Sequence, residues 1–444
     1  MNRGFVILSL CLPLLITCHP IKKTGAPPVT EAVIVIPEIP AVAHQPPASM
    51  NKTDALLEEL LQSQPEHFAG ILAGRDSLRV QIIYTQIDRQ ANNDPVFTPF
   101  YFNVNEDNYF YPASTVKMPV ALLALQRLNE LKVFGLNSNS IMITESGFSG
   151  QTPVYNDPST ADGSPSIAHY IRKIFLVSDN DAFNRLYEFL GPHYINDKLH
   201  KMDYSNAEIL HRLSVPLTEE ENRHTNPIRF ITRPGDTLYS QPMQVNTEIY
   251  SSRTDSIGEG YMTKDGLAEQ PMDFSKKNRI GLADLSGMLK SIIFPSSVPQ
   301  KQRFNLQPDE YRFVWQYMSQ YPGETLYPFY DTSYYRDAYA KFLMYGSGQG
   351  GLPKNIRVFN KVGNAYGFLT DVAYVADFEK NIEFMLSATI YCNSDGVLND
   401  DKYDYETIGF PFLKNLGRMI YDYELTRQRL IQPDLSAFIL KYDK

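Results

Sequence analysis

The sequence STVKMPVALLAL, residues 114–125, decides the fold of this chain. After Lys117 the stretch is apolar almost all round, which predicts a helix buried in the centre of a domain rather than one lying on a surface. Pro119 stands close to the expected helix start, where a missing backbone N–H costs least. We therefore expect a central helix that begins near Ser114.

The composition excludes several classes of protein. The chain has 444 residues, 43% of them hydrophobic, with 41 Lys and Arg against 50 Asp and Glu. A net charge of −9 argues against nucleic-acid binding, which needs a clustered basic surface. With 29 Tyr and 25 Phe the chain is too aromatic to be disordered. No apolar run reaches the length of about 18 residues that a membrane-spanning helix needs.

The two ends of the chain carry the patterns of one sheet. Alternating apolar residues predict strands at 78–87, 97–104, 356–361, 371–376 and 382–390. Thr53 or Asp54 is expected to cap a first helix, and apolar spacing over 412–423 predicts a last one. These elements predict an α+β fold, in which an antiparallel sheet flanked by N- and C-terminal helices receives an inserted, mainly helical lobe.

Three short motifs carry the candidate chemistry. Ser114-Thr-Val-Lys117 opens the buried helix, Ser178-Asp-Asn180 ends a helical stretch, and Lys361-Val-Gly363 closes a strand. The S-x-x-K and K-T-G patterns also occur at residues 49–52 and 23–25, near the N-terminus. The three motifs named above differ from these copies in their order along the chain and in the helix, loop and strand on which they are expected. The trio resembles the S-x-x-K, S-D-N and K-T-G motifs of class A β-lactamases and penicillin-recognising, DD-peptidase-like serine hydrolases. The resemblance extends from about Thr53 to the C-terminus, because the order of elements also fits.

The spacing of the first motif has a physical reason. Residues three apart share one helix face, so the Lys117 amine is expected to reach the Ser114 hydroxyl. Unpaired N–H groups at the helix start favour a developing negative charge. An amine acts as a base only when it is neutral, and burial together with a second cation, Lys361, is expected to lower the pKa of Lys117.

The resemblance implies a role for each motif residue. Ser114 is the implied nucleophile and Lys117 its general base. Ser178 passes a proton to the leaving nitrogen, and Asn180 holds the substrate amide and Lys117. Lys361 orders Ser178 and attracts a substrate carboxylate.

Further along the same strand, the resemblance implies substrate-binding roles for Gly363 and Asn364. The backbone N–H groups of Ser114 and Asn364 form the implied oxyanion hole.

Two features depart from the family pattern. Val362 replaces the usual Thr or Ser, whose hydroxyl helps to bind a carboxylate. No E-x-x-L-N loop supplies a glutamate for deacylation, and the corresponding region, residues 211–214, is followed by Glu219-Glu-Glu221. One of these glutamates substitutes for the missing one, or the run is a solvated face. An acyl-enzyme is therefore expected, whereas its efficient hydrolysis is not.

Other patterns are negative or open. The eight histidines form no H-E-x-x-H or H-x-H, and Cys392 has no cysteine partner, so neither metal nor other cofactor is expected. The glycine-rich segment 346–351 predicts a loop near the site strand. Residues 225–277 are polar and punctuated by Pro and Gly, and are interpreted as an insertion that either borders the site or decorates the surface.

The N-terminus predicts export. Residues 1–17 combine Arg3 with a short apolar stretch, as in a signal peptide. Leu15-Ile-Thr-Cys18 resembles the lipobox of bacterial lipoproteins, which implies cleavage before Cys18 and a lipid on its sulfur. The alternative is an ordinary signal peptide cut elsewhere. Residues 18–52 are proline-rich and predict an extended tether ahead of a domain at 53–444.

Two classes of function follow. The first is an exported serine hydrolase that acylates itself on a β-lactam or related amide or ester, or acts as a DD-peptidase or esterase on envelope material. The second is a non-catalytic lipoprotein that binds peptidoglycan or a partner. The expected ligand is a small molecule or peptide with a carboxylate, and the expected protein is a monomer held by its lipid on the periplasmic or surface side of a bacterial membrane.

Overall fold

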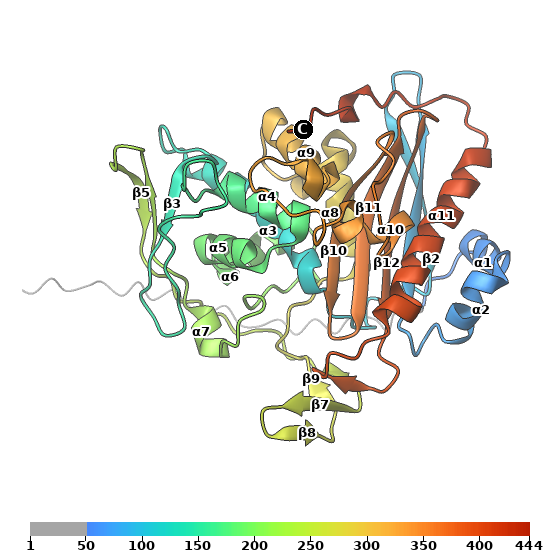
Figure 1. The fold of residues 1–444 in the computed structure, drawn as a ribbon, viewed down its shortest axis with the longest axis horizontal. Helices are drawn as coiled ribbons and strands as arrows, with labels where there is room; N and C mark the ends of the chain where they lie inside the picture. The colour runs from blue at the N-terminus through green and yellow to red at the C-terminus, as the bar shows by residue number, and fades with distance from the viewer. Residues whose placement is uncertain (1–50) are drawn as a thin grey trace, which may run out of the picture. The chain divides into compact units, whose positions relative to one another are not determined.

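The computed structural model describes residues 51–444, so the signal peptide, Cys18 and most of the tether lie outside the described residues. The main sheet consists of β1 (Gln81–Arg89), β2 (Pro95–Phe102), β10 (Ile356–Ala365), β11 (Phe368–Asp377) and β12 (Ile382–Tyr391). Its five strands run in the order β10-β11-β12-β1-β2, each antiparallel to its neighbour (Figure 1). Tyr84 of β1 lies opposite Leu386 of β12, so strands from the two ends of the chain pair as predicted.

Helices cover both faces of this sheet. One face carries α1 (Ala55–Gln62), α2 (Pro65–Ala73) and α11 (Phe410–Thr426), and the other carries α8 (Leu282–Ile293) and α9 (Pro308–Ser319) (Figure 1). The inserted lobe contains α3 (Lys117–Leu131), α4 (Ile167–Val177), α5 (Asn180–Leu190) and α6 (Pro192–Lys201). This arrangement confirms the predicted α+β fold.

Side-chain alternation along the strands divides the core into two parts. Ile82 and Tyr84 of β1 pack with α1, α2 and α11. Ile83 and Ile87, which point the other way, belong to the core cluster that includes α8 and the helical lobe. Because both faces are covered, β11 and β12 are buried along their whole length. The central helix α3 is buried from Lys117 to Gln126, as its apolar sequence predicted.

The start of α1 differs from the prediction. Asp54 stands at the N-cap, but its side chain accepts a hydrogen bond from the Tyr101 backbone N–H at 2.8 Å instead of capping the helix. Thr53 likewise accepts from the Asn103 N–H at 3.0 Å. Both residues therefore tie the helix to the end of β2, a tertiary contact that the local sequence does not reveal.

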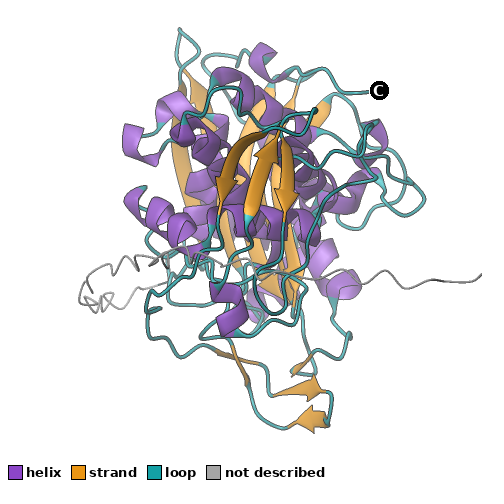
Figure 2. Cartoon of the chain, turned by 90° about the vertical axis from the view of Figure 1, so that its left-hand side faces the viewer, coloured by secondary structure: helices purple, strands orange, loops and turns teal. Residues whose placement is uncertain are grey.

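Small elements surround the lobe. The three-stranded sheet of β3 (Ile141–Thr144), β4 (Ile228–Ile231) and β5 (Thr237–Gln241) lies on the side of the lobe away from the main sheet (Figures 1 and 2). The remaining strands are β6 (Ser256–Ile257), β7 (Gly260–Thr263), β8 (Gly266–Ala268), β9 (Met272–Asp273) and β13 (Val397–Leu398). The short helices are α7 (Glu219–Arg223), α10 (Phe342–Tyr345), η1 (Ala113–Val116), η2 (Pro295–Ser297), η3 (Gln300–Gln302), η4 (Pro322–Glu324), η5 (Asp337–Ala340), η6 (Tyr405–Gly409) and η7 (Ser436–Phe438). Within residues 51–444, none of the helices combines the length and apolar character needed to cross a membrane.

Candidate active site

The three motifs meet at the seam between the main sheet and the helical lobe. Ser114 lies in η1 directly before α3, Ser178 joins α4 to α5, and Lys361 lies on β10. The Ser178 hydroxyl is the common point, because the amines of both Lys117 and Lys361 donate to it. The fold therefore brings together residues that stand far apart in the sequence.

Lys117 is a buried amine held by acceptors. Its Nζ donates to the backbone carbonyl of Ser178, to Asn180 Oδ1 at 2.6 Å and to Ser178 Oγ at 3.4 Å. The side chain has no exposed surface. Burial disfavours the ammonium form and lowers the pKa of Lys117 to about 7, against the opposing pull of the Asp179 carboxylate. Near neutral pH this amine is thus able to accept a proton.

Within residues 51–444, the Lys117 amine does not form the hydrogen bond to Ser114 that the sequence predicted. The Lys117 amine is turned toward Ser178 and Asn180 instead. The Ser114 hydroxyl has no hydrogen-bond partner within residues 51–444, and it lines an open cavity. Ala113, just before it, has a φ of 46°, a left-handed conformation that is uncommon for a residue with a Cβ. Ser114 therefore follows a sharp turn, and its hydroxyl is free to meet a ligand.

Ser178-Asp-Asn180 forms a tight junction between two helices. Ser178 ends α4 in the left-handed region with a φ of 60°, and Asp179 caps α5 by accepting from the Ala182 N–H at 2.8 Å. The motif is thus a C-cap followed by an N-cap, and the same turn directs Ser178 and Asn180 toward Lys117. Its structural and its candidate functional roles coincide.

Lys361 completes the charge arrangement from the sheet side. Its Nζ donates to Ser178 Oγ at 2.7 Å and to the Val362 carbonyl at 2.8 Å. Burial, and after it the charge of Lys117, hold the pKa of Lys361 well below its usual range. Burial is the largest cause that lowers the pKa of each of the two lysines, and repulsion between the two ammonium groups disfavours the state in which both are protonated.

Gly363 allows β10 to lie directly against the turn that carries Ser114. A Cβ at this position would stand 2.5 Å from the Pro112 carbonyl oxygen and 3.1 Å from Thr115 Cγ2. A side chain would force the strand and the turn apart, which is why glycine is required here. Asn364, the next residue, lines the same cavity as Ser114.

The cavity in front of Ser114 has a volume of about 770 Å³, within the usual range for ligand sites. Val362 and residues 346–348 of the glycine-rich loop contribute to its wall. Much of the remaining wall is tyrosine, supplied by Tyr111, Tyr334, Tyr339, Tyr366, Tyr403 and Tyr405. These tyrosines were not predicted from the sequence, and only Tyr334 and Tyr339 fall within the tyrosine-rich segment 327–339, which was the one visible signal.

Another part of the cavity wall, the segment around Ser214, was also not predicted from the sequence. Ser214 lines the cavity, and its Oγ accepts from Asn180 Nδ2 at 2.7 Å. Since Asn180 Oδ1 accepts from Lys117, one amide links the buried amine to this hydroxyl. Ser214 has a φ of 55°, so its backbone is held in a rarely used conformation.

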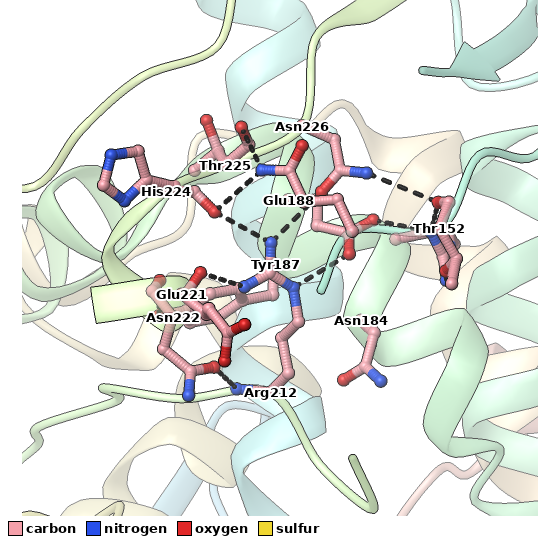
Figure 3. Close-up of polar contacts among 12 residues, drawn as sticks. Thr152, Asn184, Tyr187, Glu188, Arg212, Glu221, Asn222, His224, Thr225 and Asn226 are labelled. Carbon is pink, nitrogen blue, oxygen red and sulfur yellow. Dashed lines mark hydrogen bonds and ion pairs between the residues drawn. The ribbon is translucent and has the colours of Figure 1, made fainter. Parts of the chain in front are cut away.

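Buried ion pairs hold the segment that carries Ser214 (Figure 3). Arg212 donates to Glu188 at 2.8 Å and to the carbonyls of Glu221 and His224 at 3.2 and 3.0 Å. Asn184 clamps Leu213 by bonds to both its N–H and its carbonyl. Helix α5 thus fixes the segment as a rigid wall.

The glutamate run does not supply the missing catalytic carboxylate. Glu221 caps α7 through Thr218 and accepts from the Ser149 hydroxyl at 3.0 Å. None of residues 219–221 lines the cavity in front of Ser114. No group of three or more His, Cys, Asp or Glu placed to hold a metal occurs in the described part of the chain.

Comparison with known proteins identifies the family of the chain. The Beta-lactamase enzyme family matches residues 70–321, more than half of the chain, so the chain belongs to this family. The matched range includes Ser114 and Ser178 and ends before β10. A search of curated proteins finds no match.

Solved structures with a similar fold share little sequence with this chain. A β-lactamase from Xanthomonas campestris pv. campestris is 14% identical, with 81% of this chain and 98% of that chain covered and a TM-score of 0.45. A β-lactamase from Burkholderia ambifaria is 13% identical, with 81% and 99% covered and a TM-score of 0.43. PBP-A is 14% identical, with 85% and 98% covered and a TM-score of 0.45.

Proposed function

We propose that this chain is an exported serine hydrolase that forms an acyl-serine intermediate at Ser114 on a β-lactam or a related amide or ester. One observation carries the proposal. A fully buried Lys117, with its pKa lowered to about 7, lies one helical turn from a serine whose hydroxyl is open to a cavity. A solvated helix lysine would have neither the burial nor the three acceptors.

The proposed reaction assigns its proton transfers to Lys117 and Ser178. Neutral Lys117 takes the proton of Ser114 as its Oγ attacks the carbonyl carbon of the substrate. The backbone N–H groups of Ser114 and Asn364 receive the negative charge of the tetrahedral intermediate. Ser178, held by Lys361, delivers a proton to the leaving group as the scissile bond breaks, and the proton from Lys117 replaces it. A well-placed base contributes roughly 10²–10⁴-fold to such a rate.

Deacylation is proposed to be slow. The segment packed on Asn180 brings the hydroxyl of Ser214 to the cavity, whereas a carboxylate would be needed to activate water efficiently. Slow deacylation favours a penicillin-binding protein over an efficient β-lactamase. Its own reaction would then be that of a DD-peptidase or esterase on envelope material. An acyl-enzyme that persists for minutes is the corresponding prediction.

The location and organisation of the chain are part of the proposal. Residues 1–17 would be removed, Cys18 lipidated, and the catalytic domain at 53–444 held by the tether at 18–52, as a monomer on the periplasmic or surface side of the membrane. The lipobox-like sequence supports this. Cys18→Ala should release the protein from the membrane fraction of the expressing bacterium, and its retention there would refute lipid anchoring at this residue.

Intact mass spectrometry tests the chemistry. The purified domain and its Ser114→Ala variant are incubated with benzylpenicillin, and their masses are followed over time. A single adduct on the wild type alone establishes the nucleophile. Turnover of the antibiotic without an adduct would contradict slow deacylation. The absence of both would refute β-lactam recognition and leave the non-catalytic, peptidoglycan- or partner-binding class.

A further inference from the structure

A second cavity of about 510 Å³ adjoins the one in front of Ser114. Four residues line both cavities, namely Tyr111, Leu213, Ser214 and Tyr366. The outer wall of the second cavity comes from residues 250–277, within the segment interpreted as an insertion. This segment therefore borders a cavity that adjoins the candidate site.

Lys277 is the distinctive group of this second cavity. It is half-buried, and no carboxylate of residues 51–444 lies within ion-pair distance of its ammonium. Its Nζ lies over the ring of Tyr366, 5.9 Å from the ring centroid. Burial lowers the pKa of Lys277, and the exposed carboxylate of Asp273 opposes this only in part. The ammonium is thus partly removed from water without a counter-ion.

The other cations of this cavity are already neutralised. Lys276 binds Glu219 at 2.6 Å, and Arg212 binds Glu188 at 2.8 Å. His211 is partly buried and stacks on Tyr111, and burial lowers its pKa to about 4, so it is neutral at pH 7. Lys277 is therefore the cation with capacity for an incoming anion.

From this arrangement we infer that the second cavity binds a carboxylate on the acyl side of the substrate, with Lys277 as its counter-ion. The inference rests on the proposed function and specifies its substrate class. The side is assigned by the walls: Ser178, which protonates the leaving group in the proposed reaction, lines the first cavity and not the second. A group in the second cavity accordingly extends from the acyl part, past Ser214 and Tyr366.

Two penicillins that differ by one carboxylate test the inference in the acylation reaction. Carbenicillin is benzylpenicillin with an additional carboxylate on its acyl side chain. In Lys277→Met we expect the acylation rate constant for carbenicillin to fall about tenfold, the value of one charge-assisted contact, with little change for benzylpenicillin. Lys264→Met is the matched control, because this exposed lysine of the same inserted segment does not line the second cavity, and both of its rates should stay close to wild type.

A binding measurement separates this inference from the proposed chemistry. Ligand-observed NMR compares phenylmalonate with phenylacetate, which lacks the second carboxylate, on the same three proteins. Tighter binding of phenylmalonate that is lost in Lys277→Met alone supports the inference even if no penicillin acylates the protein, in which case only the proposed function fails. Equal binding of the two acids, or a preference that survives Lys277→Met or is lost equally in Lys264→Met, overturns the inference even if acylation occurs.

Discussion

Replacing Gly363 by alanine should separate the two halves of the candidate site. The added Cβ would meet the Pro112 carbonyl oxygen at 2.5 Å and the Thr115 backbone nitrogen at 3.2 Å. Carbon contacts are favourable at about 3.5–4.0 Å, so β10 and the turn before Ser114 must move apart by about 1 Å. Both obstacles are backbone atoms, which cannot rotate away as a side chain would.

The magnitude follows from this displacement. Overpacking of a core contact typically costs about 1–3 kcal/mol of folding free energy. A misplacement of about 1 Å at a catalytic site can lower a rate about 10²-fold. We therefore expect Gly363→Ala to remain folded and to acylate with benzylpenicillin about 100 times more slowly than the wild type.

The assay is the rate of adduct formation by intact mass, with thermal unfolding measured on the same samples. Gly70→Ala in α2 is the matched control, because a Cβ there has no atom within 4 Å. Its acylation rate should equal that of the wild type, and its stability should be unchanged or higher. A Gly363→Ala protein that acylates at the wild-type rate would show that the contact between β10 and the turn does not position the site.

Three further perturbations test the electrostatics. Because Lys117 must be neutral to act as a base, the acylation rate should rise with pH through an apparent pKa near 7. Asp179→Asn removes a carboxylate that raises this pKa, so it should shift the pH–rate profile to lower pH. An unchanged profile would contradict the role of Lys117 as the base. Lys117→Met should lower the acylation rate by at least about 10²-fold, the low end of a base's contribution. It should also raise the midpoint of thermal unfolding, because burial makes the Lys117 amine bind fewer protons in the folded than in the unfolded chain, which costs stability. A variant less stable than the wild type would contradict the lowered pKa of Lys117. Arg212→Met leaves Glu188 with one of its two buried partners and should cost about 3–5 kcal/mol in denaturant unfolding, and a loss below about 1 kcal/mol would refute a structural role for the pair.

The sequence was sufficient where a local pattern determines the structure. The apolar run after Lys117 specifies a buried helix whatever surrounds it, and the alternating segments at both ends of the chain specify strands that must pair. The order of the motifs around Ser114, Ser178 and Lys361 was sufficient to recognise the family, because the helix start, the helix junction and the strand that carry them are each indicated by neighbouring residues.

Contacts between distant segments were beyond such patterns. Nothing near residue 214 indicates that its hydroxyl will meet Asn180, and nothing near residue 277 indicates an ammonium without a counter-ion beside Tyr366. The capping predicted for the Asp54 side chain was wrong for the same reason, since its carboxylate accepts a hydrogen bond from the backbone of β2 instead.

The sequence by itself thus determined the class of fold, the family and the motif residues, because these depend on the periodicity and order of residues along the chain. Only the tertiary structure decided the direction of the Lys117 amine, the pKa that burial imposes on it, and the walls of the two cavities. Hydrogen-bond geometry and desolvation depend on which atoms surround a group in space, and those atoms come from parts of the chain that are far apart in sequence.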